Sequence, residues 1–179
     1  MKSKSTYILK ILNVISWIVF IGLCIKAGAL LYSYWVSMYL NEIAAKNLYL
    51  GLNLFQLKSF SEGDYSALVL CIIAITIAQA LLFYTVIQIF QKINFISPFH
   101  ETISKLINKM SLISLIIGLL SELTVAYSER FSGRGMDFPH LTEYIGLGSA
   151  FLFFAGILYF ISHLFLRGIE LQQENELTI

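Results

Sequence analysis

Two ionisable side chains, Lys26 and Glu122, stand inside long apolar stretches of this sequence. A charged side chain within lipid is costly unless it is paired or reaches water. The two residues therefore predict an intramembrane polar site, in which an ammonium and a carboxylate form an ion pair or face one polar cavity. Three interpretations remain open at this level: a structural pair, a proton or ion relay, and side chains that extend to the membrane surface.

The other residue types that carry chemistry are scattered along the chain. His100, His140 and His163 share no metal-ligand spacing, so we expect no metal site. Cys24 and Cys71 lie in apolar runs and form no CxxC pair, so we expect free, buried thiols. The sequence contains no nucleophile elbow, phosphate-binding loop or dinucleotide fingerprint. We therefore expect a protein that is not an enzyme and that uses no cofactor.

The composition indicates which solvent surrounds the chain. It is 58% hydrophobic and only 13% charged, whereas soluble domains carry about 25% charged residues. In water such a chain would expose too much apolar surface. The composition therefore predicts a single integral membrane domain within the lipid bilayer. The net charge of +1 gives no indication of direct nucleic-acid binding.

Four apolar stretches are long enough for membrane-spanning helices, which need about 20 residues. Backbone polar groups in lipid must bond within their own segment, so each stretch should be an α-helix. We expect the first stretch to be retained rather than removed as a signal peptide. The predicted fold is an all-α membrane protein with four transmembrane helices, at about 8–35, 66–90, 106–127 and 144–166.

The distribution of basic residues predicts the orientation. Four spans place both termini and the loop at about 91–105 on the same side of the membrane. Positive residues favour the cytoplasmic side. We therefore expect a multi-pass protein of the plasma membrane with both termini in the cytoplasm. The basic residues of the predicted cytoplasmic side are Lys2, Lys4, Lys10, Lys92, Lys105, Lys109 and Arg167, and those of the outer side are Lys46, Lys58, Arg130 and Arg134.

The first outer loop, at about 36–65, is long for a mere connection. Its segment MYLNEIAAKN is typical of a short helix, and SEGD is typical of a turn. A lid on the membrane surface and a ligand-binding cap both remain open for this loop. The second outer loop, at about 128–143, is rich in glycine and charge, so we expect it to be solvated. Alternating leucines in the first loop predict a strand or an extended cover, at Leu48, Leu50, Leu52 and Leu54.

The loop before the third span predicts a cytoplasmic helical extension. Ser97 is a good N-cap, and Pro98 suits the first helical position. A helix from Pro98 to Tyr127 would be about 45 Å long, against a hydrocarbon core of about 30 Å. The third helix is therefore expected to project into the cytoplasm.

The polar tail 167–179 leaves the fourth span on the same side and keeps an apolar edge. The tail and the projecting third helix together predict a cytoplasmic platform. Either the two segments pack on each other, or they dock a partner. The candidate docking residues are Pro98, Phe99, Ile103, Arg167, Gly168, Leu171, Glu174, Asn175, Leu177 and Ile179.

Two short motifs resemble a bacterial family of four-span membrane proteins of unknown function, the domain-of-unknown-function family 2975. One is the turn at Pro98 and Phe99, where Ser97 replaces the usual Asn. The resemblance implies no known activity. It does imply a possible partner, because members are often encoded beside a small helix-turn-helix regulator. The second motif is a tail pattern that is matched by Arg167, Gly168, Leu171, Glu174, Asn175, Leu177, Thr178 and Ile179.

Three function classes follow from these observations. The leading hypothesis is a non-enzymatic membrane regulator or adaptor, whose platform docks a cytoplasmic partner such as a helix-turn-helix transcription factor. The first alternative is a small transporter or channel subunit that uses Lys26 and Glu122. The second alternative is a structural or immunity-type membrane protein. A homo-oligomer is compatible with each of them.

Overall fold

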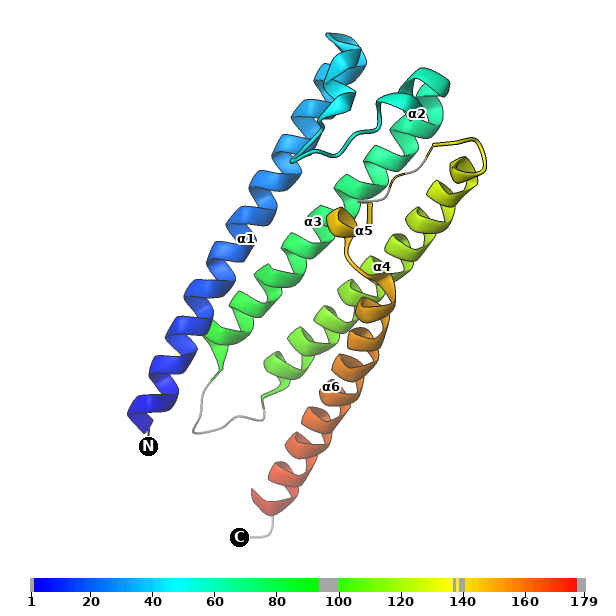
Figure 1. The fold of residues 1–179 in the computed structure, drawn as a ribbon. Helices are drawn as coiled ribbons and strands as arrows, with labels where there is room; N and C mark the ends of the chain where they lie inside the picture. Colours follow the sequence, from blue (N-terminus) through cyan, green and yellow to red (C-terminus); the bar gives the residue numbers. More distant parts are fainter. Residues whose placement is uncertain (1, 94–99, 137, 139–140, 177–179) are drawn as a thin grey trace.

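The computed structural model describes residues 2–93, 100–136, 138 and 141–176. These residues contain helices and no strand, which confirms the predicted all-α class (Figure 1). In chain order the helices are α1 (Lys2–Tyr39), the 3-10 helix η1 (Glu42–Lys46), α2 (Phe55–Phe60), α3 (Glu62–Lys92), α4 (Glu101–Ser132), α5 (Leu141–Ile145) and α6 (Gly148–Glu176).

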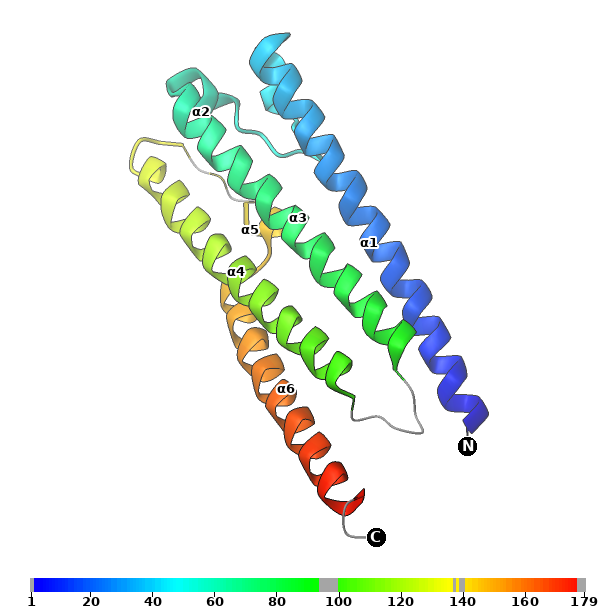
Figure 2. The same ribbon diagram turned by 180° about the vertical axis from the view of Figure 1, so that it is seen from behind.

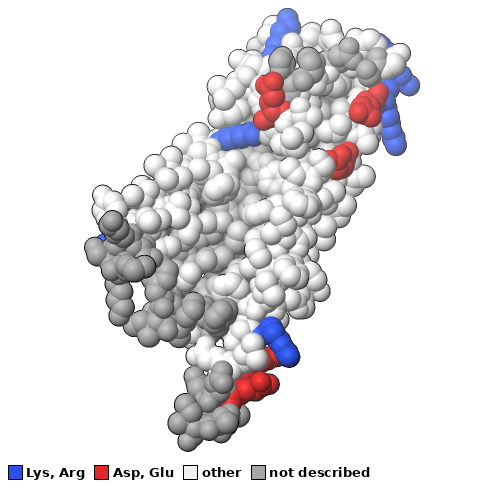
Figure 3. Space-filling view, turned by 60° about the horizontal axis from the view of Figure 1, so that its bottom comes forward, with Lys and Arg blue, Asp and Glu red and all other residues white. Residues whose placement is uncertain are grey.

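Four of these helices, α1, α3, α4 and α6, are long and apolar enough to cross a membrane, α6 together with the short α5 that precedes it. They contain the four apolar stretches predicted from the sequence. Figure 3 shows charged side chains gathered toward the two ends of the molecule, with an uncharged band between them on that face. This distribution is what a protein with a lipid-facing middle requires.

The four long helices lie side by side in a row. α1 packs on α3, α3 on α4, and α4 on α6. Figures 1 and 2 show the same order from opposite sides. No comparable interface joins α1 to α6 among the described residues. α1 contacts α3 along a narrow seam, to which the buried residues Ser16, Ala27, Leu30 and Ser37 belong, and its other faces are apolar and exposed.

The largest buried side chains gather at the end of the molecule far from both termini. There the segment between α1 and α3 folds into η1 and α2, which pack on each other and on α1 and α3. We call residues 40–61 the cap. Leu57 within the cap and Tyr65 of α3 are both fully buried. The short helix predicted in the cap is confirmed by η1.

The strand predicted from the alternating leucines was wrong. Leu48, Leu52 and Leu54 are buried, while the side chain of Leu50 is 79% exposed. The chain turns between them, because Leu50 and Gly51 have positive φ angles of 44° and 92°. The backbone N–H of Leu48 donates to the carbonyl of Leu52 (2.9 Å) and closes this turn. The three buried leucines face the core from a folded loop rather than from an extended segment.

Two helix starts differ from the predictions. The segment SEGD is the first turn of α3, not a separate turn, and the Ser61 hydroxyl accepts from the backbone N–H of Asp64 (3.3 Å). α4 begins at Glu101, because His100 is extended (φ −126°, ψ 136°). The helix predicted from Pro98 to Tyr127 was therefore wrong at His100. Ser97, Pro98 and Phe99 themselves lie outside the described residues.

The fourth predicted span contains a break near its start. α5 ends at Ile145, and α6 begins at Gly148. Gly146 has a φ angle of +82° and donates its N–H to the carbonyl of Thr142 (2.8 Å). A glycine in this left-handed conformation ends a helix, because other residues adopt it only at a cost. α6 then continues to Glu176, well past the predicted end of the span.

Candidate functional site

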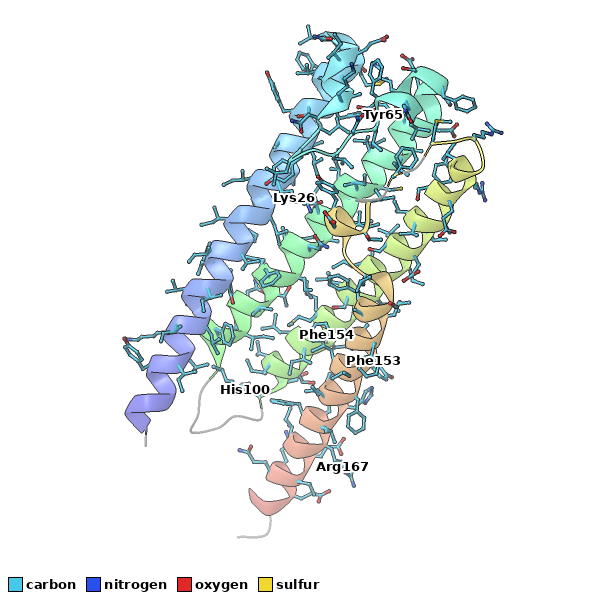
Figure 4. The ribbon with its side chains drawn as sticks, in the orientation of Figure 1. Lys26, Tyr65, His100, Phe153, Phe154 and Arg167 are labelled. Carbon is cyan, nitrogen blue, oxygen red and sulfur yellow. The ribbon has the colours of Figure 1, made fainter. Side chains whose placement is uncertain are left out.

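Polar side chains from the other three long helices converge on the break between α5 and α6. We call residues 144–148 the joint. The Lys26 ammonium of α1 donates to the carbonyl of Tyr144 (2.5 Å), and Figure 4 shows Lys26 between α1 and α5. The Gln79 amide of α3 donates to the carbonyl of Ile145 (3.0 Å). Glu122 of α4 lies against Gly148. The joint is therefore the place where all four long helices meet through polar groups.

The end of α5 explains the contacts of Lys26 and Gln79. The last carbonyls of a helix have no partner within the helix, and leaving them bare in an apolar setting is costly. Lys26 and Gln79 satisfy two of these carbonyls. A cation at a helix C-terminus is also favoured by the helix dipole. The Lys26 ammonium lies 5.9 Å from the centroid of the Tyr144 ring, which adds a cation–π contact.

The start of α6 explains the position of Glu122. A Cβ atom placed on Gly148 would lie 2.6 Å from the Glu122 Oε1 atom and 2.8 Å from the carbonyl oxygen of Gly118. α4 and α6 therefore touch through glycine backbone at this level. A carboxylate beside the first turn of a helix meets the positive end of its dipole.

The predicted direct pair between Lys26 and Glu122 is not formed. The described residues contain no ion pair between them, and Lys26 instead bonds to Tyr144. Each charge lies at one end of the interruption, the ammonium where α5 ends and the carboxylate where α6 begins. The two helix ends belong to α5 and α6, and the hydropathy of the chain does not reveal the break between them.

Charge reversal distinguishes this arrangement from a direct pair. We expect Lys26→Glu and Glu122→Lys each to lower the free energy of unfolding by about 1–2 kcal/mol, because each places a charge against a helix end of the same sign. The double reversal is expected to recover nothing, since both ends stay mismatched. Thermal unfolding in detergent measures all four proteins of this double-mutant cycle. If the double variant unfolds at the parent temperature, Lys26 and Glu122 form a direct ion pair after all.

A second polar cluster, not predicted from the sequence, fastens the cap to α1. The side chain of Lys58 is only 4% exposed, and its ammonium donates to the carbonyl of Ser37. The Ser37 hydroxyl bonds to the Tyr65 hydroxyl (2.5 Å), and Figure 4 labels Tyr65 beneath the cap. Ser37 lies in the last turn of α1. The signal available beforehand was a lysine among the apolar residues Phe55, Leu57 and Phe60.

Cys24, Cys71 and His163 lie on three different helices. Among the described residues, no group of three His, Cys, Asp or Glu side chains could hold a metal ion. His163 stacks edge-on against Tyr159, with ring centroids 4.5 Å apart, and His140 lies outside the described residues. Cys24 and Cys71 are free, as predicted, but Cys24 is exposed on α1 rather than buried.

One of the predicted docking residues is unavailable to a partner. Ile103 is only 2% exposed and belongs to the core. It lies one residue before Ser104, whose hydroxyl donates to the carbonyl of Ser162 in α6 (3.1 Å). The assignment of Ile103 to a docking surface was therefore wrong, because its side chain is used in packing within the bundle.

The docking residues of the tail that the structure describes lie on the last turns of α6. Arg167 is exposed and pairs with Glu170 (2.7 Å), and Leu171 is 50% exposed. Figure 4 shows Arg167 on the part of α6 that extends past the start of α4. Gly168 is half-buried, Glu174 is exposed, and Asn175 is helical. The predicted residues that lie outside the described part of the chain are Pro98, Phe99, Leu177 and Ile179.

Four apolar helices, a polar joint among them and a helix that extends past one end define a multi-pass helical membrane protein. The chain belongs to the family described as protein of unknown function (DUF2975), whose model matches residues 40–179. This match confirms the family suggested by the turn and tail motifs. It begins directly after α1 and covers the cap, the joint and α6. No curated protein and no solved structure matches the chain.

Proposed function

We propose that this membrane protein is a non-enzymatic regulator or adaptor, and that the last turns of α6 dock a cytoplasmic partner. We call residues 167–176 the terminal segment. The proposal includes the orientation inferred from the basic residues, in which both termini face the cytoplasm. The partner we propose is a small helix-turn-helix transcription factor.

The observation that carries the proposal is the extension of α6 beyond the helix on which it packs. α6 continues to Glu176, whereas its contact with the start of α4 is made at Ser162. Figure 1 shows the terminal segment reaching past the other long helices. Such an extension contributes little to burying the core of the bundle. Packing within the bundle does not account for these last turns of α6, whereas binding of a partner does.

The side chains of the terminal segment suit a protein partner. Leu171 is apolar and half exposed on a segment that also carries charge. Arg167 and Glu170 are held one turn apart by their ion pair, which limits the freedom that binding would have to remove. An apolar anchor surrounded by charges is the usual pattern of a helix that lies in a groove of its partner.

The joint supports a regulator more strongly than a transporter. Lys26 and Glu122, the charges that a transport path would use, lie against the two ends of the broken helix. The bond from Lys26 satisfies a carbonyl at the break and engages the ammonium in the structure. In a regulator the break need only be stable. In a proton or ion relay, the Lys26 ammonium and the Glu122 carboxylate would have to exchange their bonding partners during transport.

The decisive experiment compares partner binding by full-length protein and by a chain ending at Arg167. We expect a helix-turn-helix regulator of the kind encoded beside members of the family, co-expressed and purified in detergent, to be retained by the full-length protein and lost on truncation. Leu171→Glu should weaken the complex about tenfold or more, because burying a charge in place of an apolar anchor costs at least 1.4 kcal/mol.

The matched control is Leu40→Glu. Leu40 is also an exposed leucine, but it lies at the capped end. This variant is expected to bind the regulator as the parent does. Retention of the regulator by the truncated chain would disprove the proposed docking surface. Loss of binding in both leucine variants would point to a general effect on folding instead.

A further inference from the structure

The cap holds a strained turn whose carbonyl contacts the joint. Leu50 adopts a φ angle of 44°, which is unfavourable for a residue with a Cβ atom. Its side chain is almost fully exposed, so packing does not hold it there. The Tyr144 hydroxyl donates to the Leu50 carbonyl (2.6 Å), and Asn47 accepts from the backbone N–H of Gly51 (2.9 Å). The turn is thus held by hydrogen bonds, one of which comes from α5.

Tyr144 is bound at both of its ends. Its hydroxyl bonds to the cap at Leu50, and its own carbonyl accepts from Lys26 of α1. It lies two residues before Gly146, where the positive φ angle interrupts the helix. α5 is only five residues long. Tyr144 therefore connects the turn in the cap with α1 and with the break at Gly146.

α6 runs unbroken from Gly148 to Glu176, about 43 Å, and α4 is the only long helix on which it packs extensively in the described structure. The side chain of Leu152 lies on Gly118, and two serine hydroxyls of α4 donate to backbone carbonyls of α6, so the contact fixes one register of α6 along α4. A displaced α6 must therefore move as one rod to another register. The small residues of this contact are Gly118, Ser111 and Ser104 on α4, opposite Gly148, Ala155 and Ser162 on α6.

From these three observations we propose that Tyr144 is a mechanical link between the cap and the terminal segment. Displacing the Leu50 turn releases the Tyr144 hydroxyl, the joint relaxes at Gly146, and α6 shifts along α4. The cap is then the input of the regulator and the terminal segment is its output. This inference rests on the proposed function for its biological meaning, because the terminal segment is the proposed docking surface.

The test measures the position of α6 without any partner. Spin labels are placed on cysteines at Lys105 and Leu171, which are exposed on α4 and α6, in a chain whose Cys24 and Cys71 are replaced by alanine. The distance between the labels is measured by double electron–electron resonance in lipid nanodiscs. Tyr144→Phe removes the hydroxyl and keeps the ring. We expect the mean distance to change by about 2 Å, the size of helix shifts in switching proteins.

The matched control is Tyr39→Phe, which removes a tyrosine hydroxyl at the same end of the molecule. Tyr39 is exposed and contacts the ring of Trp35, and its variant is expected to leave the distance unchanged. A distribution in Tyr144→Phe equal to that of the parent overturns the link. Because no partner is present, this measurement does not depend on whether the regulator binds. A shift of α6 without binding would disprove only the docking proposal, and binding without a shift would disprove only the link.

Discussion

Replacing Gly148 with valine is expected to force α6 away from α4 and to lower the free energy of unfolding by about 3 kcal/mol, the upper part of the range for overpacked cores. A Cβ at this position would lie 2.8 Å from the carbonyl oxygen of Gly118 and 2.6 Å from Glu122 Oε1. The Glu122 side chain can rotate away, but the Gly118 carbonyl belongs to the backbone of α4. The two helices must therefore separate where they now touch.

Gly156→Val is the matched control for this prediction. Gly156 lies on the same helix, and a Cβ there would have no atom within 4 Å. The same chemical change is expected to leave stability unchanged or slightly raised, because glycine is a poor helix former. Thermal unfolding in detergent, followed by far-ultraviolet circular dichroism, compares both variants with the parent. Equal stability of the two valine variants would show that α4 and α6 do not meet at Gly148.

Replacing Lys58 with glutamate is expected to detach the cap from α1, at a cost of about 3–5 kcal/mol. The ammonium of Lys58 is buried and donates to the Ser37 carbonyl. A carboxylate in its place would set a second acceptor against the Ser37 carbonyl and a negative charge at the negative end of the α1 dipole. Lys58→Met keeps the apolar stem and loses the bond, so we expect a smaller loss of about 1–3 kcal/mol from the bare carbonyl.

The exposed Lys46 of η1 provides the control for the cap. Its ammonium lies 4.9 Å from the Phe55 ring centroid, and Lys46→Glu should cost no more than about 1 kcal/mol. Limited proteolysis within residues 40–61, together with thermal unfolding, reports on the cap. If cleavage in Lys58→Glu proceeds no faster than in Lys46→Glu, the buried lysine does not hold the cap in place.

The positions of the four long helices could be predicted because transfer into lipid is nearly additive over residues. The uncharged stretch that became α3 and the apolar run that became α1 each carry their signal locally. The family could be suggested for a similar reason. Its motifs, Pro98–Phe99 and the pattern from Arg167, are short and contiguous.

The contacts of the ionisable residues could not be predicted in the same way. Lys26 and Tyr144 are far apart in sequence, and the acceptor is a backbone carbonyl that every residue possesses. Only the break at Gly146 leaves that carbonyl in need of a donor. Pairing Lys26 with Glu122 was the natural prediction, because hydropathy does not reveal the break. Lys58 was likewise counted as an outer-loop charge, because its burial depends on how α2 folds back onto α1.

By itself, the sequence determined the all-helical class, the four apolar helices, the short helix of the cap and the family. These features depend on the hydropathy and identity of neighbouring residues. Only the tertiary structure decided the row of helices, the break between α5 and α6, the burial of Ile103 and the partners of Lys26 and Lys58. The transfer of an apolar helix face into lipid is favourable whichever face it is, so hydropathy does not determine which faces contact each other. Close contacts such as Gly118 with Gly148 make that choice.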